Sequence, residues 1–564
     1  MNIQERLSRL SPAKRAMFER RARGEASAPF QVGLIPQQEH ATYLLSIEQE
    51  QIWFIHQLNP ESFFLHISTA YSLVGQLNVE ALEAAVNEII DRHENLRTVF
   101  TEVEGQPMAV VLPSLRLRLT PVEIGGAPGP EREARMHQAI TGEIHRTFDL
   151  STGPLIRPVL LRLSEEEHAL LVIIHHIATD RLSLDIFWHE VITLYDAFSK
   201  GEPSPLPPLP IQYGDFALWQ RERFQSETMA EHLAYWKEKL TDAPTLSLAT
   251  DYPRPPVPIY PGARERWTIP PDQWESFTAL GLAESATRFT MFLALFSVLI
   301  YRYAGEEDLL IGSPVNNRDR VEVQGLIGYF LNTLGLRVDL SGEPTFRELL
   351  ARTRKVVLEA IAHQDLSISR VLPELKVRRD GNAPLYQVGF VYTNNVADPA
   401  AQALSLNISG LKIFYDSTPM VDMAFNAFDA AVGGAIAIDY NTSLFTQATV
   451  RRMIGHFGVL LEGALADPDR RISALPMLGE DERARLLSGL NDTARDYPRA
   501  RLLHHDFEAR AASDPDTVAL LFEGERVTYG ELDARAGRVA RRLRALGVGA
   551  EALVGVCLER SPGM

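Results

Sequence analysis

Hydrophobic positions along the chain change between helical and strand spacing, the pattern of an α/β protein. Asn78, a residue type that caps helices, precedes apolar residues that recur at helical spacing up to Ile90. Residues 169–174 (ALLVII) form a continuous apolar run rich in branched side chains, which predicts a central strand buried on both faces. Helical spacing returns over 186–198, and Gly201 is placed to end that helix.

Irregular segments divide this pattern. Residues 201–210 (GEPSPLPPLP) are proline-rich and predict a boundary between two lobes. A second irregular stretch, 251–261, contains five prolines, and Thr345 opens a further helix with a capping box. From about residue 474 the composition changes to an acidic and then an Arg-rich helical pattern, so the next domain is expected near residue 500.

A short helix is predicted over residues 11–24, with Ser11 as N-cap, Pro12 at the first helical position and Gly24 after its end. Its Lys and Arg side chains either dock an acidic partner or form a solvated basic face, and both interpretations stay open. The segment before Gly24 is charged and lacks the apolar region of a signal peptide.

Composition narrows the function classes. The 564 residues carry a formal net charge of −17, which argues against non-specific nucleic-acid binding. The single cysteine, Cys557, excludes an internal disulfide and a Cys-rich zinc site and fits a cytoplasmic location. The longest apolar run, 289–301, is shorter than the ~20 residues of a membrane-spanning helix, so no membrane partner is expected.

The candidate chemistry lies where the predicted central strand ends. His175 and His176 follow the run ALLVII, and Asp180 comes four residues after His176. Adjacent strand residues point to opposite faces, so one imidazole is expected in a crevice and the other in the core. A histidine in a crevice can take up or relay a proton at neutral pH. Two core histidines bonded to backbone are the alternative, and a metal site is disfavoured because no further ligand cluster is present.

Further motifs occur in a fixed order around this run. They are SIEQEQIWF at 46–54, RHENLRTVF at 92–100, HHIATD at 175–180, YGDFALW at 213–219, GSPVNNR at 312–318, IGYFLNT at 327–333, HQD at 363–365 and Arg379–Asp380. Over about residues 40–470 the chain thereby resembles the condensation domains of non-ribosomal peptide synthetases, members of the chloramphenicol acetyltransferase-like superfamily.

The resemblance implies an α/β fold of two chloramphenicol acetyltransferase-like lobes, a V-shaped pseudo-dimer with a central tunnel. The C-terminal part, with TYGEL at 528–532, resembles the start of an adenylation domain and stops before its phosphate loop. The implied domains are a helical linker or docking segment at 1–35, an N-lobe at 36–205, a C-lobe at 206–472, a linker at 473–500 and a truncated adenylation start at 501–564.

The resemblance also implies roles for residues. His176 orients or deprotonates the acceptor amine and helps stabilise the tetrahedral intermediate, His175 is structural, and Asp180 holds the loop through an ion pair with Arg318. Further expected positions are Arg92 and Arg97 as structural or ion-pair residues, and Arg181, Ser313 and Asn332 at the tunnel or acceptor gate.

Three departures from the family pattern concern substrate preference. Arg181 stands where the family has Gly, and it either gates the acceptor, narrows the acceptor range, marks a weakened enzyme or turns into solvent. Gln51 stands where Arg is usual, and Ser367-Ile368-Ser369 replaces Pro-Phe-Glu.

The leading hypothesis is therefore an acyltransferase that joins a carrier-bound acyl or peptidyl thioester to a carrier-bound aminoacyl amine. It needs no resident cofactor, since both substrates arrive on 4′-phosphopantetheine arms. The expected partners are an upstream donor carrier on another polypeptide, a downstream acceptor carrier and the adenylation domain that follows. The alternatives are a weakened module that recruits carriers or tailoring enzymes, and transfer to a free amine or alcohol.

Overall fold

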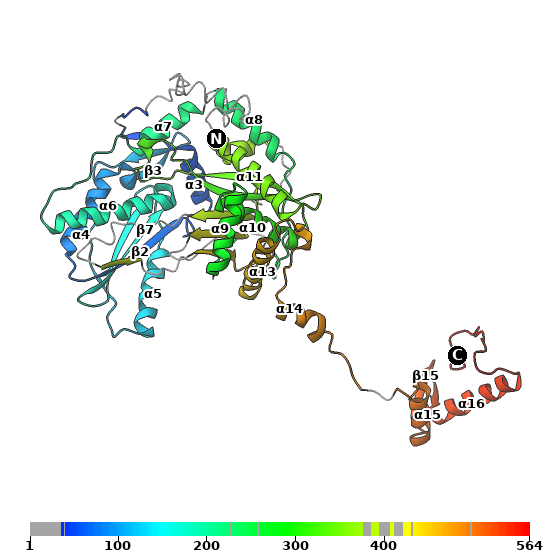
Figure 1. Ribbon diagram of the computed structural model, residues 1–564. Helices are drawn as coiled ribbons and strands as arrows, with labels where there is room; N and C mark the ends of the chain where they lie inside the picture. Colours follow the sequence, from blue (N-terminus) through cyan, green and yellow to red (C-terminus); the bar gives the residue numbers. More distant parts are fainter. Residues whose placement is uncertain are drawn as a thin grey trace. The chain divides into compact units, whose positions relative to one another are not determined.

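The computed structural model describes residues 35–564 except 39, 225–226, 256–258, 376–384, 394–406, 411–420, 430–432 and 497–498 (Figure 1). The helix predicted at 11–24 and the motif Arg379–Asp380 lie outside the described residues. By its internal contacts the chain divides after Gly479 into two units, which are described separately. This division lies within the expected linker, 473–500.

The first unit contains two main sheets, each with its own hydrophobic core. The earlier sheet has the order β12-β2-β7-β6-β5. Its strands are β2 (His66–Val74), β5 (Val122–Glu123), β6 (Ile156–Arg162), β7 (Glu167–His175) and β12 (Asn407–Gly410). β7 pairs with β2 on one side and β6 on the other, and its residues from Ala169 to Ile174 are fully buried. The central strand predicted from the run ALLVII is thus confirmed.

Helices and a small sheet complete the earlier half. The helices are α3 (Ile47–Leu58), α4 (Val79–Arg92), α5 (Pro130–Ile144), α6 (Arg181–Ser199) and α7 (Tyr213–Arg223), and the small sheet joins β1 (Thr42–Leu44), β4 (Gln106–Val111) and β3 (Thr98–Val103). The Asn78 side chain accepts a hydrogen bond from the Ala81 N–H at the start of α4, as the sequence predicted.

The later sheet has the order β10-β9-β11-β13-β14-β8. Its strands are β8 (Gly262–Thr268), β9 (Asp308–Asn316), β10 (Leu331–Asp339), β11 (Val388–Thr393), β13 (Met423–Asp429) and β14 (Gly434–Asn441), and its helices are α8 (Glu227–Leu240), α9 (Pro271–Ala283), α10 (Arg288–Ala304), α11 (Phe346–Ala362), α12 (Ile368–Val371) and α13 (Gln447–Ala466). The helix predicted from Thr345 is α11, and its capping box is formed with Glu348.

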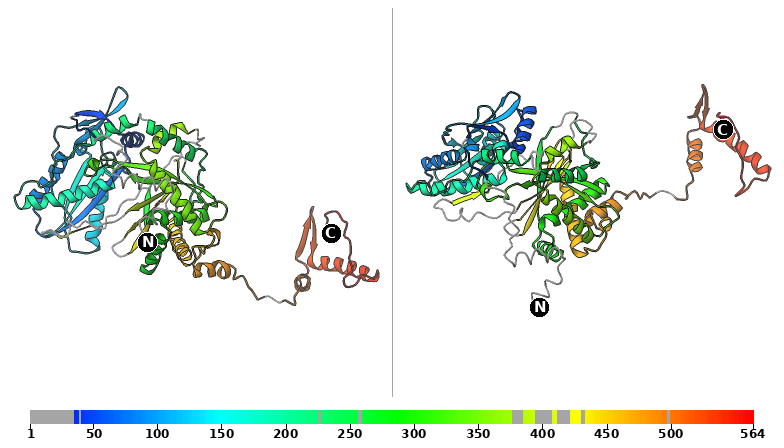
Figure 2. Two further views of the ribbon diagram at one scale, coloured as in Figure 1. Left: turned by 45° about the horizontal axis from the view of Figure 1, so that its top comes forward. Right: turned by 90° about the horizontal axis from the view of Figure 1, so that it is seen from above.

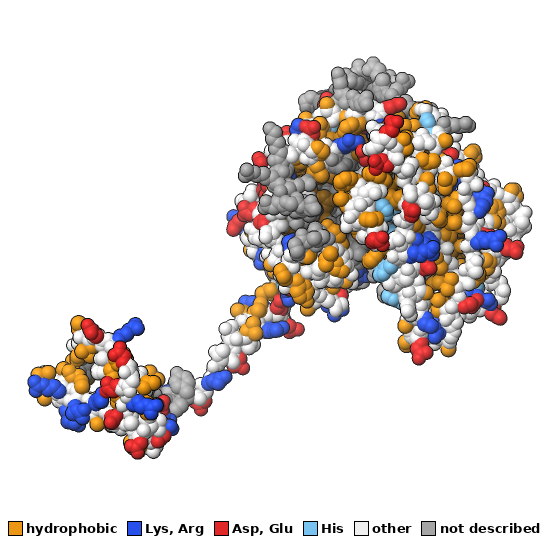
Figure 3. Space-filling model, turned by 180° about the vertical axis from the view of Figure 1, so that it is seen from behind, with side chains coloured by type: hydrophobic (Ala, Val, Ile, Leu, Met, Phe, Trp, Pro, Cys, Tyr) orange, Lys and Arg blue, Asp and Glu red, His pale blue; other side chains and the backbone are white. Residues whose placement is uncertain are grey.

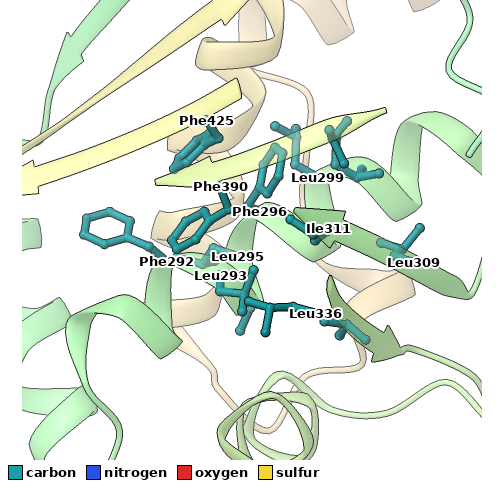
Figure 4. Packing of buried hydrophobic residues seen from close by; sticks show 14 of the residues in the cluster. Phe292, Leu293, Leu295, Phe296, Leu299, Leu309, Ile311, Leu336, Phe390 and Phe425 are labelled. Atoms are coloured by element: carbon teal, nitrogen blue, oxygen red, sulfur yellow. The ribbon is translucent and has the colours of Figure 1, made fainter. Parts of the chain in front are cut away.

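The apolar run at 289–301 forms most of α10, whose residues from Thr290 to Ile300 are all buried. Figure 4 shows Phe292 and Phe296 of this helix among the aromatic side chains of the sheet. The Phe296 and Phe425 rings lie 4.8 Å apart between centroids. In the described part of the chain, no single helix has both the length and the hydropathy that a membrane-spanning helix needs. Among the described helices, one pair, α9 and α10, meets these criteria when taken together, but the two helices are bent by 107° relative to each other.

Two segments of the later half join the earlier one. β12 pairs antiparallel with β2, so it extends the first sheet (Figure 2). Residues 317–330, called the crossing segment below, place Val323, Leu326, Ile327 and Phe330 in the first core.

The two hydrophobic cores separate after the expected lobe boundary, 205/206. The α7 residues Phe216 and Ala217 still belong to the first core, and the second core begins at Met229 of α8. The proline-rich segment therefore lies inside the first half, because the aromatic face of α7 is buried there.

The second unit contains α14 (Glu480–Ala484), α15 (Leu503–Ser513), β15 (Val518–Phe522), β16 (Glu525–Thr528) and α16 (Tyr529–Ala545). Among its described residues Ala511 and Val527 are the buried hydrophobic ones, whereas Leu503 is fully exposed. Its core is therefore small. On the face of the molecule in Figure 3, positive and negative side chains are interspersed.

The crossing segment generates a packing prediction. A Cβ atom on Gly328 would lie 2.0 Å from Cδ2 of Tyr213, which is fully buried. We expect Gly328→Ala to lower the free energy of unfolding by about 1–3 kcal/mol, because a crowded core has to shift its side chains or backbone.

Denaturant unfolding followed by tryptophan fluorescence measures this change. Gly455→Ala on α13 is the control, since a Cβ there meets nothing within 4 Å and alanine favours a helix by roughly 1 kcal/mol. Equal stability of Gly328→Ala and the wild type would contradict the prediction.

Candidate active site

The two adjacent histidines lie at the end of β7 in different surroundings. His175 is fully buried, and its Nδ1 accepts a hydrogen bond from the Ile177 N–H at 3.2 Å. His176 begins a 3₁₀ turn, η2 (His176–Ala178), and part of its ring stays accessible. The alternation expected from strand geometry therefore agrees with one histidine in the core and one at an accessible position.

A backbone contact fixes the tautomer of His176. Its Nδ1 lies 2.8 Å from the carbonyl oxygen of Thr179, and a carbonyl only accepts, so Nδ1 carries the proton. The neutral ring then has its lone pair on Nε2, for which the described residues provide no hydrogen-bond partner. Burial lowers the pKa of His176, while the Thr179 carbonyl and Asp180 oppose that shift. His176 is therefore a neutral base at pH 7.

Side chains from two other motifs hold the turn after β7. Gln49 of α3 donates from Nε2 to the Ile177 carbonyl at 3.0 Å, and Asn95 donates from Nδ2 to the Ala178 carbonyl at 2.8 Å. Gln49 also donates to Asn95 at 3.3 Å. Three motifs that are far apart in the sequence thus converge on the backbone that carries His176.

Asp180 caps α6 and forms a buried ion pair. Its carboxylate accepts hydrogen bonds from the Ser183 N–H at 2.7 Å and the Phe330 N–H at 3.1 Å. Arg318 approaches Oδ1 at 3.2 Å, and both side chains are almost completely buried. Burial lowers the pKa of Arg318, an effect that Asp180 opposes.

One terminal nitrogen of Arg318, Nη1, binds the crossing segment, while Nη2 also donates to Ser183 Oγ at 2.6 Å. Nη1 donates to the carbonyls of Val323 and Leu326 at 2.9 and 2.7 Å, and the guanidinium lies 4.0 Å from the centre of the Phe330 ring. One arginine therefore fixes both the start of α6, through Asp180, and the path of the chain between the two cores.

Arg92 and Arg97 lie in a structural network rather than beside the reacting ring. Glu190 of α6 accepts from Arg92 at 3.0 Å and from His93 Nε2 at 2.9 Å. His93 Nδ1 in turn accepts the Ile327 N–H at 3.3 Å. Arg97 donates to backbone carbonyls at the end of α4 and to Leu112, so it holds β3 against that helix.

The expected gate residues have other surroundings. Ser313 is fully buried and donates to the Phe390 carbonyl at 2.9 Å. Asn332 is also buried and donates to the carbonyls of Gln364 and Leu366 at 2.6 and 3.1 Å. Both side chains bind backbone inside the second half, and their expected place at the tunnel or acceptor gate stays a prediction.

Arg181, the third expected gate residue, is about half exposed. Its guanidinium pairs with Asp185 one turn further along α6 at 2.9 Å. Of the alternatives left open by the sequence, this geometry favours a side chain turned into solvent.

Three residues of the site received no role from the sequence. Ser183 Oγ is bonded to both the N–H and the carbonyl of Gly328, at 3.0 and 2.8 Å. Tyr213 donates its hydroxyl to the Tyr329 carbonyl at 2.6 Å, and the Tyr329 ring meets the His176 ring edge-on at 4.8 Å. Ser183 lies three residues after an N-cap aspartate and Tyr213 opens a motif, so the sequence contained a signal for a role of both residues. The position of Tyr329, in contrast, depends on tertiary contacts.

Among the described residues no group of three or more His, Cys, Asp and Glu side chains has metal-binding geometry. The 4′-phosphopantetheine arms on which the substrates are expected to arrive stay a prediction from the sequence.

The buried ion pair generates a stability prediction. Arg318→Met leaves Asp180 buried without its cation, and we expect the free energy of unfolding to fall by about 3–5 kcal/mol. The double variant Arg318→Met/Asp180→Leu removes both charges and should lose less. Denaturant titration compares them, with Arg162→Met, at an exposed pair with Glu123, as the unchanged control. Similar losses in Arg318→Met and the control would contradict the prediction.

The histidine rings around His175 generate a pH prediction. His66 Nδ1 donates to the Ile144 carbonyl at 2.6 Å, and burial lowers the pKa of His66 to about 4. Because the unfolded chain takes up this proton near pH 6.5 and the folded one only near pH 4, the stabilising effect is present above pH 6.5 and is lost as the pH falls toward 4.

At pH 5 we expect this one group to cost about 1–2 kcal/mol of stability relative to pH 7.5. Unfolding free energies of the wild type and His66→Asn across this range measure the effect as a difference in slope. His504→Asn in the second unit is the control, since its side chain is exposed. Parallel curves for the wild type and His66→Asn would overturn the assignment.

Comparison with known proteins places this geometry in a family. The family model for the condensation domain matches residues 39–487, and that for the AMP-binding enzyme matches residues 507–564. A linear gramicidin synthase of Brevibacillus parabrevis is 40% identical over 548 residues, which are 96% of this chain and 7% of that protein. Phosphinothricin tripeptide synthetase of Streptomyces viridochromogenes is 36% identical, over 99% of this chain and 52% of that protein.

Solved structures share the fold. A four-domain non-ribosomal peptide synthetase bound to AMP and glycine aligns over 92% of this chain and 40% of that chain, with a TM-score of 0.80 and 21% identity. The X-domain from teicoplanin biosynthesis aligns over 78% of this chain and 99% of that chain, with a TM-score of 0.71 and 28% identity. The chain spans 7–13% of the length of the first four curated relatives.

The family match covers most of the chain and includes every residue described in the active site. The chain therefore belongs to the condensation domain family of non-ribosomal peptide synthetases, and its C-terminal residues 507–564 match part of the AMP-binding enzyme family.

Proposed function

We propose that the first unit forms an amide bond between a carrier-bound acyl or peptidyl thioester and the amine of a carrier-bound aminoacyl thioester. The observation that carries this proposal is the accessible Nε2 of His176, on a ring whose other nitrogen is bonded to the Thr179 carbonyl. A neutral imidazole held in one tautomer is suited to receive a proton from an attacking amine.

The reaction requires that a bond from the amine nitrogen to the acyl carbon forms while the bond from that carbon to the donor sulfur breaks. Nε2 of His176 takes the proton that the amine loses. The imidazolium then gives the proton to the departing sulfur, so the histidine returns to its starting state. Asp180 and Arg318 do not take part in proton transfer, because both are consumed in buried hydrogen bonds.

The partners in this proposal are an upstream donor carrier, a downstream acceptor carrier and an adenylation domain that loads the acceptor. The match of residues 507–564 to the AMP-binding enzymes supports the last of these. The two carriers are supported by the relatives, which are named as a gramicidin synthase and a tripeptide synthetase.

The alternative of a recruiting module without catalysis has less support. Its one sequence argument was Arg181, whose side chain pairs with Asp185 and is half exposed. The proposed location is the cytoplasm, in keeping with a single free cysteine.

The test supplies donor and acceptor thioesters on carrier proteins and follows the product by intact-protein mass spectrometry. We expect His176→Ala to lower the condensation rate by about 10²–10⁴, because general base catalysis is lost. His504→Ala is the matched control and should retain the wild-type rate, since this histidine is exposed in the second unit. A His176→Ala variant as fast as wild type would exclude the assigned base. A wild type that condenses no substrate pair would favour the recruiting module.

A further inference from the structure

The backbone of residues 328–330 is held from both sides. Ser183 Oγ binds the N–H and the carbonyl of Gly328, Tyr213 donates to the carbonyl of Tyr329, and Asp180 accepts the N–H of Phe330 at 3.1 Å. Four of the six backbone polar groups in this tripeptide are thus fixed by buried side chains. The short segment is one of the most constrained backbones near the active site, and such constraint positions a side chain accurately.

The three residues of this tripeptide differ in the surroundings of their side chains. Gly328 has none, and Phe330 is fully buried between Arg318 and the ring of Tyr213. Tyr329 is the exception, because it is only partly buried and its ring lies edge-on to His176, with 4.8 Å between centroids and 79° between planes. Of the three residues on this constrained backbone, Tyr329 is therefore the one whose side chain contacts the proposed base, His176.

The Tyr329 hydroxyl is available to a ligand. The described residues provide no hydrogen bond to it, although its carbonyl is bonded to Tyr213. Burial raises the pKa of Tyr329 well above its usual value, and the charges of Glu48 and Asp180 raise it further. The phenol therefore keeps its proton at any pH at which the condensation is measured, so it acts as a donor and never as a base.

The rings that carry a hydroxyl donor and a base are in contact, and amide formation needs both groups. An amine nitrogen about 3 Å from Nε2 of His176 carries its proton to that atom. The oxygen of the attacked thioester is one bond away from the carbon that the amine attacks, and it becomes negative as the tetrahedral intermediate forms. A fixed donor about 3 Å from this oxygen stabilises the charge without reorganising.

We propose that the Tyr329 hydroxyl donates a hydrogen bond to the thioester oxygen of the acyl donor in the tetrahedral intermediate. The amine nitrogen bonds to the acyl carbon, its proton passes through His176 to the departing sulfur, and Tyr329 keeps its own proton throughout. This role rests on the proposed condensation activity and adds a second group in contact with the reacting atoms.

The test compares Tyr329→Phe with wild type on carrier-bound donor and acceptor. Phenylalanine keeps the ring against His176 and removes only the donor. We expect kcat to fall at least about tenfold, since removal of one such donor costs as much or more in other acyl transfers. KM for the acceptor carrier and the midpoint of the acid limb of the pH–rate profile should stay unchanged, because neither docking nor the titration of His176 involves the hydroxyl.

Tyr195→Phe is the matched control. It removes a tyrosine hydroxyl that accepts the Asn78 N–H at 3.1 Å in the same core, away from His176, and should keep the wild-type kcat. Thermal unfolding of both variants separates loss of fold from loss of chemistry.

Two outcomes overturn the inference on its own: a Tyr329→Phe kcat reduced by less than tenfold, or a reduction accompanied by a shifted acid limb, which would mean that the hydroxyl acts through His176. If wild type and Tyr195→Phe make no product either, the proposed condensation activity is contradicted. The inference about Tyr329, which rests on that activity, is then contradicted as well.

Discussion

The buried pair of Asp180 and Arg318 is the contact on which the rest of the active site depends. Removing two charges from water is costly, and further hydrogen bonds to both groups offset that cost. Here the carboxylate also accepts two backbone N–H groups, and the guanidinium reaches two carbonyls and Ser183. Asp180 belongs to the earlier half and Arg318 to the later one. Their ion pair therefore also joins the two halves.

The crossing segment links this ion pair to the surroundings of His176. Its apolar residues complete the first core, and its backbone is bonded to Ser183, Tyr213 and Asp180. The close approach of Gly328 to the Tyr213 ring leaves no space for a side chain at this position. Rigidity next to His176 thus comes from packing and buried polar bonds together, whereas Nε2 of the ring has no hydrogen-bond partner among the described residues.

Local features were predictable from the sequence because they depend on neighbouring residues. The run ALLVII identified β7, Asn78 identified the cap of α4, and the alternation along a strand separated His175 from His176. The features that were missed depend on which distant segments meet. Burial of Ser313 and Asn332, the addition of β12 to the first sheet and the contact of Tyr329 with His176 carry no local pattern.

The resemblance to a family indicated the partner of Asp180, whereas the point at which the two cores separate depends on packing. Proline-rich composition marks an extended segment, and an extended segment need not separate two cores. The aromatic residues of α7 continue the first core past that segment, so burial rather than chain flexibility decides where one half ends.

A lowered pKa at His176 serves both halves of the proposed proton transfer. Burial weakens the imidazole as a base, but it also makes the imidazolium a stronger acid once the proton has arrived. A departing thiolate, with an ordinary pKa of about 8.5, takes that proton readily. Since the Thr179 carbonyl keeps Nδ1 protonated throughout, the same atom, Nε2, both receives the proton and returns it. The ring therefore does not have to rotate between the two proton transfers. This agrees with its fixed position, which is set by the contacts with Thr179 and Tyr329.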